Sequence, residues 1–243
     1  MRAVITAGGT LEGAFAHAAG TRVKALAPFG ARTLLDVALD ACAQSGIDGV
    51  AVVGGPEVRA HLRGTGVGVI DAVEDGGTNV LRALDAWRGE RFAYLTSDLP
   101  FADGAGLQDL IGRSAPFALT MGLTAVGAFD ARFPGAPPHG VTLRGERVVN
   151  ACAFVLAPEA LEPVRSLATR FFDARKSLFA LARLLGPGLC LRFLTKRLGV
   201  DDVEAYARRV LRVSVGAVRD TDPGLCYDVD TLEEYRYACA RLG

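Results

Sequence analysis

Short apolar runs alternate with helix-like segments through the first hundred residues, and this alternation limits the chain to few folds. The runs are apolar at nearly every position rather than at every second one, which is typical of strands buried on both faces. Strands that alternate with helices form a mainly parallel sheet with right-handed crossovers. The strand-like runs are residues 3–7, 50–54, 67–72 and 92–98, and the helix-like segments are residues 33–46, 56–64 and 77–89.

The second half of the chain has a less regular pattern. Strands are expected at residues 117–123, 151–158 and 211–218, and helices around residues 158–167 and 174–185. The end of the chain predicts a short strand and then a helix, whose Thr231 and Glu234 fit a capping box. Because no linker separates two cores, we expect residues 1–243 to form a single α/β domain with a helical C-terminal insertion at about 160–210.

Composition excludes several classes of function. The 27 basic residues balance the 27 acidic ones, and neither half is strongly basic, so nucleic acid is not an expected partner. Five scattered cysteines without a CxxC pair are typical of reduced thiols in a cytoplasmic protein. The three histidines are dispersed, which argues against a zinc site. We expect neither a signal peptide nor a transmembrane segment, because no apolar run reaches about 20 residues.

The stretch VITAGGTLEG, residues 4–13, places Gly8 and Gly9 directly after the first predicted strand. Ligands bind outside the carboxyl ends of strands in an open parallel sheet. Backbone amides without a Cβ can approach phosphate oxygens closely there. A plain turn between strand and helix is the alternative. The spacing fits neither the dinucleotide-binding G-x-G-x-x-G motif nor the P-loop.

Four motifs follow one another along the chain: AGG at residues 7–9 with Lys24 and GIDGVAVVGG (46–55), DGGTNVLRALDA (75–86), LTSDLPF (95–101) and YDVDTLEEY (227–235). Their order and spacing resemble the MobA-like (molybdenum-cofactor guanylyltransferase-like) NTP transferase family. The resemblance covers nearly the whole chain, and its second half is similar to a bacterial branch with a longer C-terminal part. It implies a GT-A-like, Rossmannoid three-layer α/β/α domain with a mixed, mostly parallel sheet.

The resemblance implies a Mg²⁺-dependent nucleotidyltransferase. Such an enzyme transfers NMP from an NTP, here CTP or GTP, to a small phosphorylated acceptor and releases pyrophosphate. Asp98, after an apolar strand, is the first expected metal ligand, with a turn or helix cap as its structural alternative. Asp230 is the second, and Asp228 a third, because residues two apart on a strand share one face. Mg²⁺ prefers one or two carboxylates together with phosphate oxygens and water.

Lys24 and Asp98 are the expected catalytic residues, and Lys24 is expected to contact the triphosphate. The loop before Lys24 is longer than in the family and lacks its S-x-R-M-G-like run, so Arg22 is the candidate substitute. For residues 78 and 79 a role in capping a helix is the alternative. The expected nucleotide-binding residues are Ala7, Gly8, Gly9, Thr10, Arg22, Lys24, Gly77, Thr78 and Asn79.

The acceptor is less well defined by the sequence. Asn150, before the 151–158 strand, matches the acceptor-side position of the family, and Arg132, Arg175 and Lys176 are candidate contacts for its phosphate. Residues 177–200 are unusually apolar with interspersed basic residues. They predict a helical pair, broken at residues 186–188, that packs on the sheet or on a second subunit of a homodimer. The alternative is a lid or membrane-surface patch that admits a lipid-like acceptor.

Two other functions remain open at this stage. A GT-A glycosyltransferase also uses two nearby aspartates on a metal, with a nucleotide sugar as donor. It usually lacks the glycine loop and lysine that suit a triphosphate, so the sequence favours the nucleotidyltransferase. A non-catalytic nucleotide-binding protein would bind the same ligand without releasing pyrophosphate.

Overall fold

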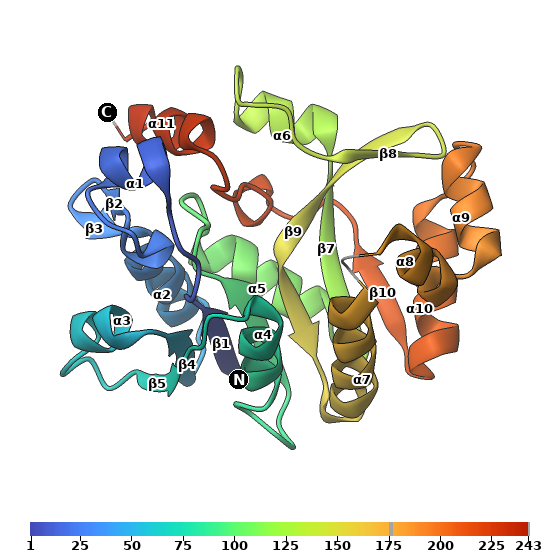
Figure 1. Cartoon of the computed structure of the whole chain (residues 1–243), viewed down its shortest axis with the longest axis horizontal. Coiled ribbons are helices and arrows are strands. Elements are labelled where there is room, and N and C mark those ends of the chain that lie inside the picture. Colours follow the sequence, from blue (N-terminus) through green and yellow to red (C-terminus); the bar gives the residue numbers. More distant parts are fainter. Residues whose placement is uncertain (175–176, 243) are drawn as a thin grey trace.

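The computed structural model describes residues 1–174 and 177–242, and its centre is an eight-stranded mixed sheet (Figure 1). The main strand order is β10-β7-β9-β6-β1-β4-β5, and β8 pairs with β9. Among the described strands of this sheet, β9 alone breaks the parallel arrangement, since it runs antiparallel to its neighbours β6, β7 and β8. The strands are β1 (Arg2–Thr6), β4 (Gly49–Gly54), β5 (Gly68–Asp71), β6 (Phe92–Thr96), β7 (Leu119–Ala125), β8 (Val141–Leu143), β9 (Glu146–Leu156) and β10 (Val215–Val218), with a separate hairpin of β2 (Pro28–Phe29) and β3 (Arg32–Thr33).

Helices cover both faces of the sheet, which confirms the predicted three-layer arrangement (Figure 1). Local sequence signals set their ends. Thr33 and Asp36 form a capping box at the start of α2, and Gly46, with a φ of 77°, follows its end. The helices are α1 (Gly13–Ala19), α2 (Leu34–Gln44), α3 (Pro56–His61), α4 (Gly76–Leu84), α5 (Gly104–Arg113), α6 (Val126–Arg132), α7 (Pro158–Ala174), α8 (Leu178–Leu185), α9 (Pro187–Leu194), α10 (Val200–Leu211) and α11 (Leu232–Ala240), with 3₁₀ turns η1 (Lys24–Leu26) and η2 (Pro223–Leu225).

The core explains why the strands are continuously apolar. Ile5 and Leu95 face one layer, which includes residues of α2 and α5, whereas Val4 and Tyr94 face the other, with residues of α4 and α7. Neighbouring residues of one strand therefore enter two different clusters. A strand buried in this way needs apolar side chains at both alternating sets of positions.

The register brings the ends of distant strands together. Thr6 of β1 pairs with Val53 of β4 on one side and with Thr96 of β6 on the other. The hydrogen bonds continue one residue further, since the Ser97 amide donates to the Thr6 carbonyl at 3.1 Å. The loops that follow β1 and β6 therefore leave the sheet side by side at its carboxyl edge.

The C-terminal half differs in detail from the sequence prediction. Residues 227–230 form no strand, although Thr231 and Glu234 do form the predicted capping box of α11. The predicted helical pair is present as α8 and α9, and Gly186 separates them with a φ of 84°. No residue of α9 is buried. Within the described part of the chain, every helix is too short or too polar to cross a bilayer.

Candidate active site

The loop after β1 runs beside the segment that carries Lys24. The Leu11 amide donates to the Arg22 carbonyl at 2.8 Å, and the Lys24 amide donates to the Gly9 carbonyl at 3.0 Å. In residues 1–174 and 177–242, the amides of Gly8, Gly9 and Thr10 have no hydrogen-bond partner, and all three residues are exposed. Exposed amides without a partner are free to donate hydrogen bonds to an anion.

The two glycines are required by close packing and not by an unusual backbone angle. Neither Gly8 nor Gly9 has a positive φ. A Cβ on Gly8 would lie 2.8 Å from Nδ2 of Asn79, and a Cβ on Gly9 would lie 3.3 Å from Cδ of Lys24. A turn that only glycine can form is therefore not the reason for the pair. Glycine fits here because the side chains of Asn79 and Lys24 occupy the space that a Cβ would need.

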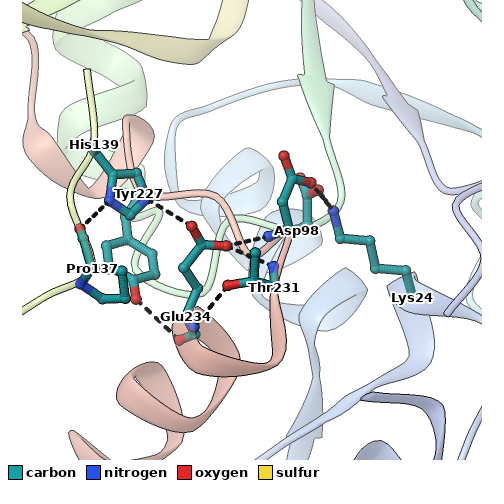
Figure 2. A network of polar contacts seen from close by, with 8 residues as sticks. Lys24, Asp98, Pro137, His139, Tyr227, Thr231 and Glu234 are labelled. Carbon is teal, nitrogen blue, oxygen red and sulfur yellow. Dashed lines mark hydrogen bonds and ion pairs between the residues drawn. The ribbon is translucent and has the colours of Figure 1, made fainter. Parts of the chain in front are cut away.

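Lys24 lies between two carboxylates from distant parts of the chain (Figure 2). Its Nζ donates to Oδ2 of Asp98 and, at 2.6 Å, to Oδ1 of Asp230. The Lys24 and Asp98 side chains are each only 13% exposed, whereas Asp230 is 69% exposed. The Val229 amide also donates to the Asp98 carbonyl at 3.1 Å, which fixes the backbone of the two acidic segments together.

The cluster holds more negative than positive charge. Burial, and then the charges of Asp98 and Asp230, together raise the pKa of Asp228 to about 6. Burial acts to lower the pKa of Lys24, but the charges and hydrogen bonds of Asp98 and Asp230 outweigh it, so this pKa is raised. Oδ1 of Asp98 is buried and has no hydrogen-bond partner in the described residues. Such an oxygen is costly unless a ligand pairs with it.

A polar network centred on Glu234 fixes the acidic segment 227–230 (Figure 2). Glu234 Oε2 accepts from the amides of Asp230 and Thr231 at 2.8 and 2.7 Å, and the Tyr227 hydroxyl donates to the Glu234 carbonyl at 3.0 Å. The ring of His139 packs on that of Tyr227, with centroids 5.0 Å apart. Sequence reasoning missed His139 and Tyr227 as supports, and only the capping box pointed to this role for Glu234.

Asp228 and Asp230 share a side of the segment even though it is not a strand. Tyr227 and Val229 are buried, whereas Asp228 is half-buried and Asp230 is exposed. Buried and more exposed residues therefore alternate along residues 227–230 as they would in a strand, although the segment pairs with no other described strand. Asp228 lies close to Asp98 and Asp230, because their charges contribute to its raised pKa.

The predicted nucleotide residues 77–79 lie in the first turn of α4, and their side chains are engaged locally. Asp75, and neither Thr78 nor Asn79, is the N-cap, and it accepts from the Thr78 amide at 2.7 Å. Asn79 exchanges hydrogen bonds of 2.8 Å with the backbone of Val73, and Gly77 is buried against Phe172. The contact of Asn79 with Gly8 is what links this turn to the loop after β1.

The remaining predicted residues are dispersed. Ala7 is buried at the end of β1, and Arg22 is exposed beside the glycine loop. Asn150 lies on β9 opposite Leu123. The guanidinium of Arg132 lies over the Phe133 ring, 5.7 Å from the centroid. Arg175 and Lys176 lie outside the described residues.

A donor loop and a lysine–carboxylate cluster at the carboxyl edge of an open sheet are typical of Rossmann-like α/β proteins that bind phosphorylated ligands. The comparison with protein families is more specific, because the MobA-like NTP transferase domain matches residues 3–186. The chain belongs to this family of nucleotidyltransferases. No curated protein matches the sequence.

Solved structures share the fold over nearly the whole chain. A hypothetical transferase from Thermus thermophilus is 27% identical, with a TM-score of 0.82 over 96% of this chain and 98% of its own. CMP:2-keto-3-deoxy-manno-octonic acid synthetase complexed with CTP is 14% identical, with a TM-score of 0.59 over 99% and 97%. A Mycobacterium tuberculosis protein in complex with manganese is 19% identical, with a TM-score of 0.57 over 98% and 97%.

Proposed function

We propose that this protein is a Mg²⁺-dependent nucleotidyltransferase that moves NMP from an NTP, CTP or GTP, to a small phosphorylated acceptor. The observation that carries the proposal is the position of Lys24 between Asp98 and Asp230, beside the unpaired amides of the glycine loop. An oxygen of the acceptor phosphate attacks the α-phosphorus. The bond from that phosphorus to the bridging oxygen breaks, and pyrophosphate leaves with the electron pair.

The amides of Gly8, Gly9 and Thr10 and the ammonium of Lys24 are the proposed triphosphate contacts. Phosphoryl and nucleotidyl transfer depend on positioning and on neutralising charge, because the enzyme supplies little covalent chemistry. Donors fixed in position before the substrate arrives need no reorganisation during the reaction. The packing of Asn79 and Lys24 against the two glycines supports such a fixed loop.

The charge of the cluster suits a divalent cation. Three carboxylates face one ammonium group, and Oδ1 of Asp98 has no partner among the described residues. No group of three or more His, Cys, Asp or Glu side chains is arranged as a metal site in residues 1–174 and 177–242. Mg²⁺ does not need one, since it commonly takes one or two carboxylates and completes its shell with phosphate and water.

We propose Asp98 and Asp230 as the metal ligands, with Asp228 beside them. Bound Mg²⁺ would offset the charge on the α-phosphate and on the departing pyrophosphate. Among the described residues, Oδ1 of Asp98 is free for a metal, whereas Lys24 holds Oδ2, and the triphosphate offers Lys24 a new anionic partner. Lys24 therefore holds the acidic side chains in place until metal and nucleotide replace it.

We further propose that residues 1–243 act as one domain with a helical insertion at about 160–210, in the cytoplasm. The five cysteines are free thiols, which fits a reducing compartment. The helices α7 to α10 supply that insertion, and they lie beside the β7–β9–β10 half of the sheet (Figure 1).

The test is a pyrophosphate-release screen over four NTPs and a panel of phosphorylated acceptors, with Mg²⁺. The proposal expects release that needs NTP, acceptor and metal together and is lost in Asp98→Asn. Asp130→Asn, an exposed carboxylate on α6, is the matched control and should keep full activity. Nucleotide binding without pyrophosphate release would favour a non-catalytic protein. Release of a nucleoside diphosphate from a nucleotide sugar would instead favour a glycosyltransferase.

A further inference from the structure

An apolar pocket of about 320 Å³ lies between the sheet and α10. Its floor is formed by strands β7, β9 and β10, and α10 stands beside them (Figure 1). The volume is within the range of small-molecule sites, and corresponds to roughly ten non-hydrogen atoms. The side chains that matter most for its character are Met121, Leu123, Phe154, Val203, Ala207 and Val215.

Two polar side chains line this pocket among the described residues, and one of them already accepts hydrogen bonds from the protein. Glu204 Oε1 accepts from the Ala217 amide at 2.6 Å, and its Oε2 accepts from Arg208 at 2.8 Å. Asn150 is exposed and makes no side-chain hydrogen bond in the described part of the chain. An occupant therefore finds few polar partners in an otherwise apolar wall.

Strand β9 carries residues that line the pocket and, between them, a residue close to the acidic cluster. Asn150, Cys152 and Phe154 are alternate residues of β9, so their side chains share one face of the sheet. Ala153 pairs with Leu95 of β6, three residues before Asp98. Cys152 is close enough to the cluster that, after burial, the charges of Asp228 and Asp98 raise its pKa. The same strand thus connects the reaction centre to the pocket.

The apolar surface at the pocket mouth is not covered by the chain itself. Val141 is 42% exposed and Val203 is 36% exposed, and both line the opening. On α10, Val200, Val203 and Ala207 follow the spacing of one helix face, which is turned to the pocket. The helix therefore presents an apolar stripe to a space that is partly open to solvent in the described part of the structure.

We propose that this pocket binds the carbon part of the acceptor, and that the acceptor is a phosphate monoester of an apolar alcohol rather than of a polyhydroxy compound. The inference rests on the proposed nucleotidyl transfer, in which the acceptor phosphate is the attacking group. That phosphate would lie towards the acidic cluster. The several hydroxyl groups of a sugar or polyol would lose water in this pocket and find, among its described lining side chains, only Asn150 and the already bonded Glu204 as partners. An alkyl, isoprenoid or aromatic group fits the wall without that loss.

The test compares octyl phosphate, kept below its micelle concentration, with glycerol phosphate by isothermal titration calorimetry. We expect octyl phosphate to bind at least about ten-fold more tightly. Ala207→Trp places an indole in the pocket and should weaken octyl phosphate by about ten-fold or more. Ala205→Trp is the matched control, because Ala205 is on the same helix, is exposed and faces away from the pocket. It should bind as the wild type does.

Equal affinity for the two phosphates, or unchanged octyl phosphate binding in Ala207→Trp, would overturn the proposal. If Ala207→Trp does not fold, as judged by its melting curve, Val203→Gln at the rim serves the same comparison. Mg²⁺–NTP binding is measured separately in each variant and should not change. If the wild type binds no Mg²⁺–NTP, this result counts against the proposed function and not against the pocket, since octyl phosphate is titrated without nucleotide.

Discussion

Replacing Asp228 by Asn should stabilise the protein without metal, and the gain should depend on pH. Burial, then the charges of Asp98 and Asp230, raise the pKa of Asp228 from 3.8 to about 6. Each unit of pKa corresponds to about 1.4 kcal/mol, so the ionised form is disfavoured by at most about 3 kcal/mol. Part of the side chain contacts water, which screens the charges and makes this figure an upper value.

The sign follows from the direction of the pKa change. The raised pKa of Asp228 contributes stability that is fully present below the unfolded value of 3.8 and is lost as pH rises through about 6. Asn cannot ionise, so Asp228→Asn should match the wild type near pH 4 and exceed it by up to about 3 kcal/mol near pH 7. Asp130→Asn, which removes an exposed carboxylate, should show no such growing difference.

The assay is urea denaturation of the three proteins across this pH range, in EDTA and again in Mg²⁺. Mg²⁺ should raise the stability of the wild type near neutral pH more than that of Asp228→Asn, because a ligand stabilises the state to which it binds. A difference between Asp228→Asn and wild type that stays constant from acid to neutral pH would refute the reasoning about this cluster.

Three further substitutions test separate parts of the account. Lys24→Met should lower kcat by about 10²–10³, measured as pyrophosphate release, because one charge opposite the phosphates is removed. Gly8→Ala adds a Cβ 2.8 Å from Asn79 Nδ2 and should raise KM for the NTP, whereas Gly76→Ala, with no atom within 4 Å, should leave KM unchanged. Thr33→Ala removes the cap of α2 and should cost about 1 kcal/mol in thermal unfolding, with unaltered activity in the folded enzyme.

The central half of the sheet could be predicted from sequence because both of its faces are buried. Val4 and Ile5 enter different hydrophobic clusters, so the strand is apolar throughout and is recognisable without a partner. The antiparallel β9 gives no such signal, since its direction depends on pairing with β6 and β7 and not on its own residues. For residues 227–230 the sequence predicted a strand that is not present, because the alternation of apolar and acidic residues there does not come from pairing in a sheet.

The site was predicted only as far as local motifs allow. Gly8, Gly9 and Asp98 follow strands whose carboxyl ends meet, so their convergence follows from topology. The bridge that Lys24 forms to Asp98 and Asp230 joins residues 74 and 206 positions apart and depends on tertiary packing. The apolar pocket could not be predicted for the same reason, since residues of four strands and α10 form it.

The most direct measurement is a crystal structure with Mg²⁺ and a non-hydrolysable NTP. The account predicts a metal about 2.1 Å from a carboxylate oxygen of Asp98. It also predicts phosphate oxygens on the amides of Gly8 and Gly9, and Lys24 moved from a carboxylate to the phosphates. A nucleotide bound elsewhere, with Lys24 still joined to both Asp98 and Asp230, would contradict it.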